Sequence, residues 1–459
     1  MLREWIKKYP VVTSGLVILI IKLLLWPWAE ITDADAVSRI IYAYDLAAGW
    51  HVVQDTIWPP AHFYFLALGA EISDNPQVLP IGMHILVSWL GFFTMYAWLK
   101  QWNSSQQALF ASILFSLSPL ALRLGNSPMA ESFLIALLPA VLYYLNKRDW
   151  KTADILKAGL IMTVTCAFRY EAWLIGCLIG VWLVLEKRYK DFLIFGAATT
   201  LFPIYWMLVQ WQSTGDFLYG IHGNDVWTHQ YLGMKFETDP EILARRFIFF
   251  PFSLWIAIGP VAVYLWWKAK ITYSGSERHL ALVAGLYLLI EIYQSVAGNL
   301  MSHHRLTAVL LILSMPFLSR VHWNLQKVAI SVCLTIGLSL LYPMEGIGPI
   351  PRMKYREVVT MNQEMQSADI RGDKVLIDFI GWDNTYYTLL AQFRHNSIVM
   401  SDAMSDSDKL GLIGSLVQTS HYLLVTRLDS PLIELIAKNY KGTEMWRGER
   451  YVVLRIEKK

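Results

Sequence analysis

Four aspartates stand close together in the stretch that reads ITDADAVSRIIYAYDLAAGWHVVQDTIWPP. They are Asp33, Asp35, Asp45 and Asp55, and they follow an apolar run from Val11 to Trp28. Carboxylates beside a bilayer are costly to desolvate, so they typically mark a functional site or cap a helix. The chemistry open to such groups is proton abstraction or the binding of a hard cation.

The same stretch predicts the element that positions these carboxylates. Asp33 or Thr32 can cap a short helix that has Asp35 in its first turn, and we expect Trp58-Pro59-Pro60 to end it. Its apolar face is formed by residues at helical spacing, which are Val37, Ile40, Ile41, Tyr44 and Ala48. We expect this helix to lie along the membrane surface. In the alternative interpretation, Asp35 only offsets the helix dipole and pairs with Arg39.

The composition predicts a polytopic α-helical membrane protein. Hydrophobic residues make up 55% of the 459 residues, and the charged residues, only 16%, gather between long apolar runs. Because a spanning helix needs about 20 mostly apolar residues, these runs predict about eleven spans. They lie near 11–28, 78–99, 106–122, 130–146, 154–168, 172–186, 191–211, 248–267, 280–297, 306–319 and 327–343.

Lysine and arginine recur in the loops at every second span, which predicts the orientation. These loops carry Lys100, Lys147/Arg148/Lys151, Lys187/Arg188/Lys190, Lys268/Lys270 and Arg320/Lys327. We expect them to be cytoplasmic, which places the acidic stretch, the loop 212–247 and the tail after Tyr342 outside. In a prokaryote the membrane would be the plasma (inner) membrane. The net charge of +3 gives no indication of a nucleic-acid partner.

Three of the expected outward turns contain an arginine, although basic residues are normally scarce on that side. The turns hold Arg123 with Glu131, Arg169-Tyr170-Glu171, and His303-His304-Arg305. Arginine at a membrane surface suits bidentate binding of a phosphate or carboxylate. Alternatively, each arginine pairs with a glutamate across adjacent helix ends. The occurrence of three such turns favours an anionic ligand in a shared outward cavity.

Two further features are candidates for substrate contact. Glu291 lies inside an expected span, where an ionisable group is a functional candidate by default, although it can also bond a neighbouring helix. The loop 212–247 mixes aromatic and polar residues, Tyr219 among them. Such a mixture suits contact with a sugar or head group, and it is equally typical of interfacial anchoring.

The chain after residue 343 has a different pattern. Buried-strand patterns at 374–380, 397–401, 421–426 and 451–456 alternate with helical patterns at 385–395, 408–419 and 431–440. This alternation predicts a small, mainly parallel α/β domain. We therefore expect a transmembrane catalytic domain over 1–343 and an extracytoplasmic accessory domain over 344–459.

The acidic stretch resembles the first outward loop of the GT-C glycosyltransferases, and most of all that of protein O-mannosyltransferases and lipid A aminoarabinose transferases. In that family an Asp after the first span is followed by a surface helix, a glycine, an Asp and a His-Pro-Pro motif. Here Asp35, Gly49, Asp55 and Pro59-Pro60 stand in that order. Trp58 replaces the histidine, and Ala36 replaces the acidic residue that often follows the first Asp. Glu131 resembles the acidic position of the family's second outward loop.

The resemblance implies transfer of a hexosyl or pentosyl group from a polyprenyl-phosphate donor to a glycan, lipid or protein acceptor. It implies Asp35 as general base, with Asp33 as the alternative. Glycosyl transfer also needs positive groups at the leaving phosphate, for which the candidates are Arg305, His303, His304, Arg123 and Arg169. The candidates for other substrate contacts are Asp55, Glu131, Glu171, Tyr170, Glu291 and Tyr219. No cofactor is required, although Asp33, Asp35 and Glu131 offer oxygen ligands to a divalent metal.

A transporter or lipid flippase is the alternative function, because many spans with intramembrane carboxylates also suit a proton-coupled carrier. The polar residues crowd towards one face, however, whereas a carrier binds its substrate near the midplane. A non-catalytic membrane scaffold that presents the tail is a third possibility, but it leaves the acidic stretch without a role.

Overall fold

The computed structural model describes residues 8–26, 34–54, 56–73, 78–147, 149–226, 228–229, 234–269, 273–300, 302–341, 361, 374–378, 397–400, 404–417, 422–448 and 451–458. Contacts divide the chain into two compact units. The helical unit comprises Met1–Glu30, Gly49–Gly69 and Gln77–Pro351. The sheet unit comprises Ile31–Ala48, Ala70–Pro76 and Arg352–Lys459.

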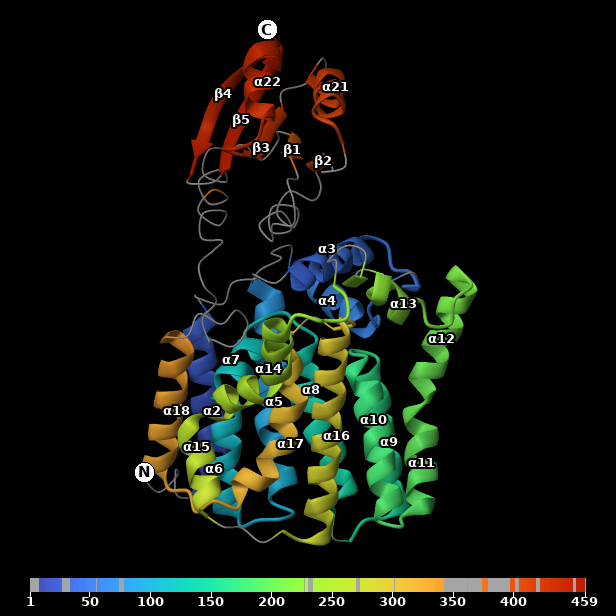
Figure 1. The fold of residues 1–459 in the computed structure, drawn as a ribbon, viewed down its shortest axis with the longest axis vertical. Coiled ribbons are helices and arrows are strands. Elements are labelled where there is room, and N and C mark those ends of the chain that lie inside the picture. The colour runs from blue at the N-terminus through green and yellow to red at the C-terminus, as the bar shows by residue number, and fades with distance from the viewer. Residues whose placement is uncertain are drawn as a thin grey trace. The chain divides into compact units, whose positions relative to one another are not determined.

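The helical unit is a bundle whose long helices run roughly along one direction (Figure 1). Its first half contains α2 (Pro10–Leu25), α4 (Ala61–Ala70), α5 (Val78–Leu99), α6 (Ser105–Ser116), α7 (Pro119–Gly125), α8 (Glu131–Leu145), α9 (Thr152–Cys166) and α10 (Glu171–Leu185). Its second half contains α11 (Tyr189–Thr199), α12 (Leu201–Thr214), α13 (Tyr219–Val226), α14 (Pro240–Ile258), α15 (Pro260–Lys268), α16 (Gly275–Ala297), the 3₁₀ turn η3 (His304–Thr307), α17 (Ala308–Ser319) and α18 (Leu325–Leu341).

The described helices identify an integral membrane protein. Three are long and apolar enough to cross a bilayer, namely Val78–Leu99, Tyr189–Thr214 and Gly275–Ala297. The number rises to five if each of two bent helix pairs forms one span. Further apolar helices are shorter: Pro10–Leu25, Ala61–Ala70, Glu131–Leu145, Glu171–Leu185, His304–Ser319 and Leu325–Leu340. The count of about eleven spans stays a prediction.

Each of the two bent pairs is a helix interrupted by a short non-helical segment. The axis turns by 64° between α6 and α7, where Ser118 caps the new helix through Ala121 N–H and Pro119 occupies its first position. It turns by 90° between α14 and α15 at Gly259, whose φ of 90° lies in the region that favours glycine. Helix ends exposed by such breaks can bind other groups inside the bundle.

Small residues let the helices of the bundle approach closely. Gly91 of α5 faces the Ile135 carbonyl of α8, and a Cβ at this position would lie 2.9 Å from that oxygen. One turn further, Thr94 Oγ1 donates a hydrogen bond to the Ala136 carbonyl at 2.8 Å. Close backbone approach with polar side-chain bonds is the usual basis of helix association in lipid, where no hydrophobic drive acts between helices.

The basic loops meet at one end of the helical unit. Arg188 Nη1 donates to the Leu145 carbonyl at 3.0 Å, and His279 Nδ1 lies 2.7 Å from Glu186 Oε1. Arg320 Nε donates to Glu277 Oε1 at 2.8 Å. These bonds link loops whose lysines and arginines predict that they lie on one side of the membrane.

The sheet unit contains a five-stranded sheet of order β2-β1-β3-β5-β4. Its elements are β1 (Lys374–Asp378), β2 (Ser397–Met400), α21 (Asp406–Val417), β3 (Tyr422–Arg427), α22 (Leu432–Asn439), β4 (Tyr440–Arg447) and β5 (Tyr451–Lys458). The strands β2, β1 and β3 are parallel, whereas β5 runs antiparallel to both β3 and β4. The expected mainly parallel sheet is therefore only half parallel, because β4 was not anticipated. The expected helix over 385–395 lies outside the described residues.

The helix that carries Asp35, α3 (Ala34–Ala48), belongs to the sheet unit by its contacts. It begins at Ala34, next to the two expected cap residues, and ends at Ala48 before Gly49. The expected end at Trp58-Pro59-Pro60 is therefore wrong, because the helix already stops at the glycine. The buried face differs from the predicted one: Ile40 and Tyr44 are buried, but Ala48 is exposed. Among the other residues buried on this helix are Ala36, Arg39, Ala43 and Leu46.

The grouping of the basic loops leads to a topology prediction. In a cysteine-free background, single cysteines at Lys190 and Ser407, both exposed, should react with an impermeant maleimide from opposite sides of the membrane. Labelling is measured in intact and in inverted vesicles. Reaction of both cysteines from the same side would contradict the predicted orientation.

Candidate functional site

A buried ion cluster joins the beginnings of α8 and α10. Glu131 opens α8 and is 1% exposed, while Glu171 opens α10 directly after Arg169 and Tyr170. Arg169 Nε donates to Glu171 Oε2 at 2.9 Å, and its Nη2 pairs with Glu171 Oε1. The same Nη2 lies 3.3 Å from Glu131 Oε1. Arg169 therefore bridges two carboxylates through a bidentate and a single contact.

A second arginine reaches the same carboxylate from a distant part of the chain. Arg305, in η3, places its Nε 3.4 Å from Glu131 Oε1. Its side chain is 15% exposed, against 10% for Arg169. The structure thus brings together Glu131, Arg169, Glu171 and Arg305 from the candidate residues. Arg169 pairs with glutamates at the helix ends, which was the alternative to binding an anionic ligand.

The electrostatic balance differs between the two arginines. Burial of Arg169 favours the loss of its proton, but the carboxylates of Glu131 and Glu171 outweigh this effect and raise its pKa above the ordinary value. Arg169 binds Glu171 through two nitrogens, Nε and Nη2. Arg305 lies at the Glu131 carboxylate, with its Nε 3.4 Å from Glu131 Oε1.

The Arg305 turn is held by one face of α14. Ser253 Oγ lies 2.9 Å from His304 Nδ1 and 2.8 Å from Thr307 Oγ1. Phe249, one turn earlier on α14, stacks on the His304 ring with centroids 4.5 Å apart. His304 is therefore a buried support of the turn, and His303 Nδ1 accepts a bond from the Arg305 backbone N–H at 3.3 Å.

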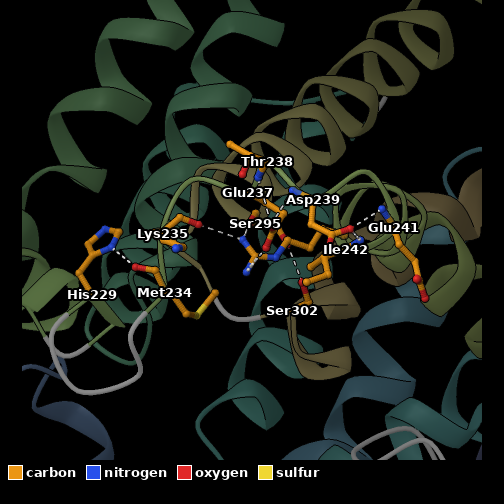
Figure 2. A network of polar contacts seen from close by, with 11 residues as sticks. His229, Met234, Lys235, Glu237, Thr238, Asp239, Glu241, Ile242, Ser295 and Ser302 are labelled. Carbon is orange, nitrogen blue, oxygen red and sulfur yellow. Dashed lines mark hydrogen bonds and ion pairs between the residues drawn. The ribbon is translucent and has the colours of Figure 1, made fainter.

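A network of polar contacts that includes Lys235, Glu237 and Ser295 anchors the same region (Figure 2). Arg246 Nη1 donates to the carbonyls of Ser295 and Lys235, at 3.0 and 3.3 Å, and its Nη2 pairs with Glu237 at 3.4 Å. Ser295 Oγ, near the end of α16, bonds Ser302 Oγ, which directly precedes His303. The network therefore ties the segment before α14 to the chain that leads into Arg305.

Tyr170 lies between Arg169 and Glu171 in the sequence. Its hydroxyl accepts a hydrogen bond from Trp206 Nε1 at 3.0 Å, and burial raises its pKa to about 12. Gly220 packs against this hydroxyl so closely that a Cβ would overlap it. Tyr219, at the start of α13, is half-buried beside that contact.

Glu291 lies on α16 and is 4% exposed. It is within electrostatic reach of Glu171 and Arg169, and its Oε2 receives no hydrogen bond from the described residues. A buried carboxylate with Tyr287 beside it on the same helix is a candidate for a substrate contact. Glu291 therefore joins the cluster that the other site residues form.

An aromatic and histidine layer lies next to the ion cluster along α8. Phe133 stacks on Phe168, with centroids 3.6 Å apart, and both residues lie two positions or fewer from a charged member of the cluster. His62 Nε2 and His84 Nε2 are 2.9 Å apart, and the His84 ring packs edge-on against Phe133. This layer was not anticipated from the sequence.

The remaining candidates are placed as follows. Arg123 lies in the last turn of α7 and is half-buried. Asp35 belongs to the sheet unit, and its participation with the cluster stays a prediction. Asp33 and Asp55 lie outside the described residues, as do the contacts they make.

The described residues contain no group of three His, Cys, Asp or Glu side chains spaced to hold a metal ion. Glu131, one of the expected metal ligands, already faces two guanidinium groups. A divalent cation at that carboxylate would meet two positive charges at short range, which disfavours Glu131 as a ligand.

Sequence reasoning also missed Lys22, which interrupts the run from Val11 to Trp28 that was treated as apolar. It is 1% exposed in α2. The signal was available, because an ionisable residue inside an apolar run is a functional candidate by default. Arg246 and Ser253 had no such signal, since their role depends on contacts with distant segments.

No family model and no curated protein matches the sequence. Solved structures do match in fold. ArnT from Cupriavidus metallidurans bound to undecaprenyl phosphate superposes with a TM-score of 0.65 at 13% identity, over 96% of this chain and 97% of that one.

Two other solved structures are similar over most of this chain. The Archaeoglobus fulgidus oligosaccharyltransferase in the apo form has a TM-score of 0.51 at 10% identity, over 96% of this chain and 74% of that one. The mycobacterial arabinofuranosyltransferase AftD has a TM-score of 0.52 at 12% identity, over 100% of this chain and 40% of that one. The chain therefore has the GT-C glycosyltransferase fold, which confirms the expected resemblance.

The buried position of Glu131 predicts a large effect of its replacement on stability. Glu131→Gln leaves two guanidinium groups without their shared counter-charge, and we expect a loss of about 3 kcal/mol, typical of a broken buried ion pair. Thermal unfolding of the purified protein in detergent measures the change.

The control is Glu241→Gln, which removes a carboxylate that pairs with Arg245 on the exposed surface of α14. Exposed pairs contribute little, so this variant should unfold close to the wild type. Equal effects of the two replacements would show that the Glu131 cluster has no special role in the fold.

Proposed function

We propose that the protein is a glycosyltransferase that moves a sugar from a polyprenyl-phosphate donor to an acceptor at the extracytoplasmic face of the membrane. The observation that supports this best is the Glu131–Arg169–Arg305 cluster inside a bundle with the GT-C fold. Buried guanidinium groups at one end of such a bundle are suited to an anionic lipid head group.

In this proposal the two arginines have different roles. Arg169 is locked by Glu171 and fixes the position of Glu131. Arg305 contacts the donor phosphate, exchanging its 3.4 Å contact with Glu131 for a bidentate bond to the phosphate oxygens. The more exposed Arg123 is a second candidate for that phosphate, and His303 a third. His304, already bonded to Ser253, supports the turn.

The transfer step needs one base and one stabilised leaving group. A nucleophilic atom of the acceptor attacks the anomeric carbon, forming the new glycosidic bond as the bond to the phosphate oxygen breaks. Asp35 accepts the proton of the acceptor, and the polyprenyl phosphate leaves with the electron pair of the broken bond, its charge stabilised by Arg305. Asp33 is the alternative base.

The other candidates contact the sugar and the acceptor. Glu171, Glu291, Tyr170 and Tyr219 extend from the ion cluster along α10, α16 and α13, and Asp55 follows α3 in the chain. Carboxylates and hydroxyls of this kind bind sugar hydroxyl groups. The mechanism requires no metal, because arginine supplies the positive charge at the leaving group.

The test of this function is a transfer assay with purified protein. A panel of radiolabelled polyprenyl-phosphate hexoses and pentoses is incubated with the protein, and transfer to added acceptors or slow hydrolysis is followed. At least one donor should be consumed. If every donor stays intact while the protein moves a labelled lipid or solute across a vesicle membrane, the transporter alternative is correct.

The phosphate role predicts the behaviour of Arg305 variants. Arg305→Ala should weaken binding of undecaprenyl phosphate about tenfold to a hundredfold, because charge-assisted hydrogen bonds are lost. Binding is measured by thermophoresis in detergent. Arg245→Ala, on the exposed face of α14, is the matched control and should bind as the wild type does. Unchanged affinity of Arg305→Ala would exclude Arg305 as the phosphate contact.

The base is tested with amide substitutions. Asp35→Asn keeps the size and polarity of the side chain but cannot accept a proton, so transfer should fall about a hundredfold or more while donor binding persists. Asp33→Asn should have a smaller effect if Asp33 only caps α3, because asparagine caps a helix about as well as aspartate does. Exchanged effects would identify Asp33 as the base, and full activity of both variants would place the active site elsewhere.

A further inference from the structure

Lys22 is a cation inside an apolar helix, and no role has yet been assigned to it. It lies on α2 with 1% of its surface exposed, and no described carboxylate forms an ion pair with it. A charged side chain in such a segment is costly, so it is retained only where it makes specific contacts. Its contacts show which part of the bundle it stabilises.

The ammonium group of Lys22 packs against the side of the short helix α7, between Ala121 and Gly125. Its Nζ is 3.4 Å from the Ala121 carbonyl. A side chain at Gly125, in the last turn of α7, would overlap both Lys22 Nζ and Ser88 Oγ. Glycine is therefore needed for this close approach.

The contact is reciprocal. Near the end of α2, Trp26 N–H bonds to the Leu23 carbonyl, and the Lys22 carbonyl accepts a hydrogen bond from Asn126 Nδ2 at 3.0 Å. Asn126 is also the C-cap residue of α7, with its backbone N–H bonded to the Leu122 carbonyl. Each helix therefore satisfies polar groups of the other. We call this pair of contacts the Lys22–Asn126 clamp.

The clamp holds the chain just before a member of the ion cluster. After Asn126 a short buried turn leads to Glu131, whose carboxylate faces Arg169 and Arg305. The turn is fixed to α7 on one side and to α8 on the other. A shift of Asn126 would therefore move Glu131 and the arginine that depends on it.

We propose that Lys22 is a positioning residue: through Asn126 it fixes the turn that carries Glu131 and thereby keeps Arg305 in place for the donor phosphate. The proposal rests on the proposed function for the identity of the ligand. The clamp itself is a property of α2 and α7. These two parts can be measured separately.

Three variants and one control test the clamp. Lys22→Met removes the charge with little change in length, Asn126→Ala removes the reciprocal bond, and the double variant removes both. Leu24→Met is the control, because Leu24 lies on the same helix and is 65% exposed. The first readout is amide hydrogen exchange in detergent, comparing the segment 119–130 with the segment 105–116 of α6. The second readout is the affinity for undecaprenyl phosphate, well below the unfolding temperature.

Each single variant should speed exchange in 119–130 about tenfold, while exchange in 105–116 stays as in the wild type. The double variant should be little worse than either single variant, because both contacts belong to one clamp. Affinity for undecaprenyl phosphate should fall in parallel, whereas Leu24→Met changes neither readout. If Lys22→Met fails to fold, Asn126→Ala provides both measurements.

Unchanged exchange in 119–130, or a uniform rise throughout the bundle, would overturn the clamp. Faster exchange with unchanged affinity would overturn the positioning role. If the wild type binds no undecaprenyl phosphate at all, the proposed donor is wrong, and the exchange data still decide whether the clamp exists.

Discussion

The arrangement of the site depends on one buried carboxylate. Glu131 is almost completely withdrawn from solvent, and a carboxylate in that position is tolerated only with opposite charge close by. The two guanidinium groups that supply it come from the start of α10 and from η3, far apart in the sequence. Three segments must therefore meet within a few ångströms. Much of the polar structure around them, from Ser253 on α14 to Arg246 and Ser295, has the effect of fixing their approach.

The burial of Glu131 is also compatible with different roles for the two arginines that pair with it. Arg169 is held by Glu171 in a bidentate pair next to it in the chain, and such a pair has little reason to open. Arg305 shares Glu131 with Arg169, with its Nε 3.4 Å from Oε1. A phosphate group competing for Arg305 would leave Glu131 still paired with Arg169. The carboxylate therefore keeps one counter-charge when ligand is bound and both when it is absent, so neither state buries an unpaired charge.

The sequence predicted the parts of this arrangement that depend on local pattern. The turns with Arg169 and Arg305, the start of α3 after Asp33, and the strands β1, β2, β3 and β5 follow from periodicity and from charge placed where it is rare. It did not predict β4, whose residues Tyr440–Arg447 are mostly exposed and lack an apolar run. It also could not show that Arg169 pairs with Glu171 while Arg305 reaches Glu131, because that depends on how distant helices pack. The face of α3 was misjudged for the same reason: packing buries Arg39 and leaves Ala48 exposed.

The fold persists at 13% identity because lipid places few demands on the apolar residues of a helix bundle. Leucine, isoleucine, valine and phenylalanine can replace one another on lipid-facing surfaces with little consequence, so these positions say little about function. Buried polar residues are the exceptions, since each must be compensated by a specific partner. In this chain Lys22, Glu131, Arg169 and Glu291 are such exceptions. Glu131, Arg169 and Glu291 belong to one cluster, and Lys22 holds the turn that leads to it. We therefore expect the buried polar residues of this apolar chain to mark the site.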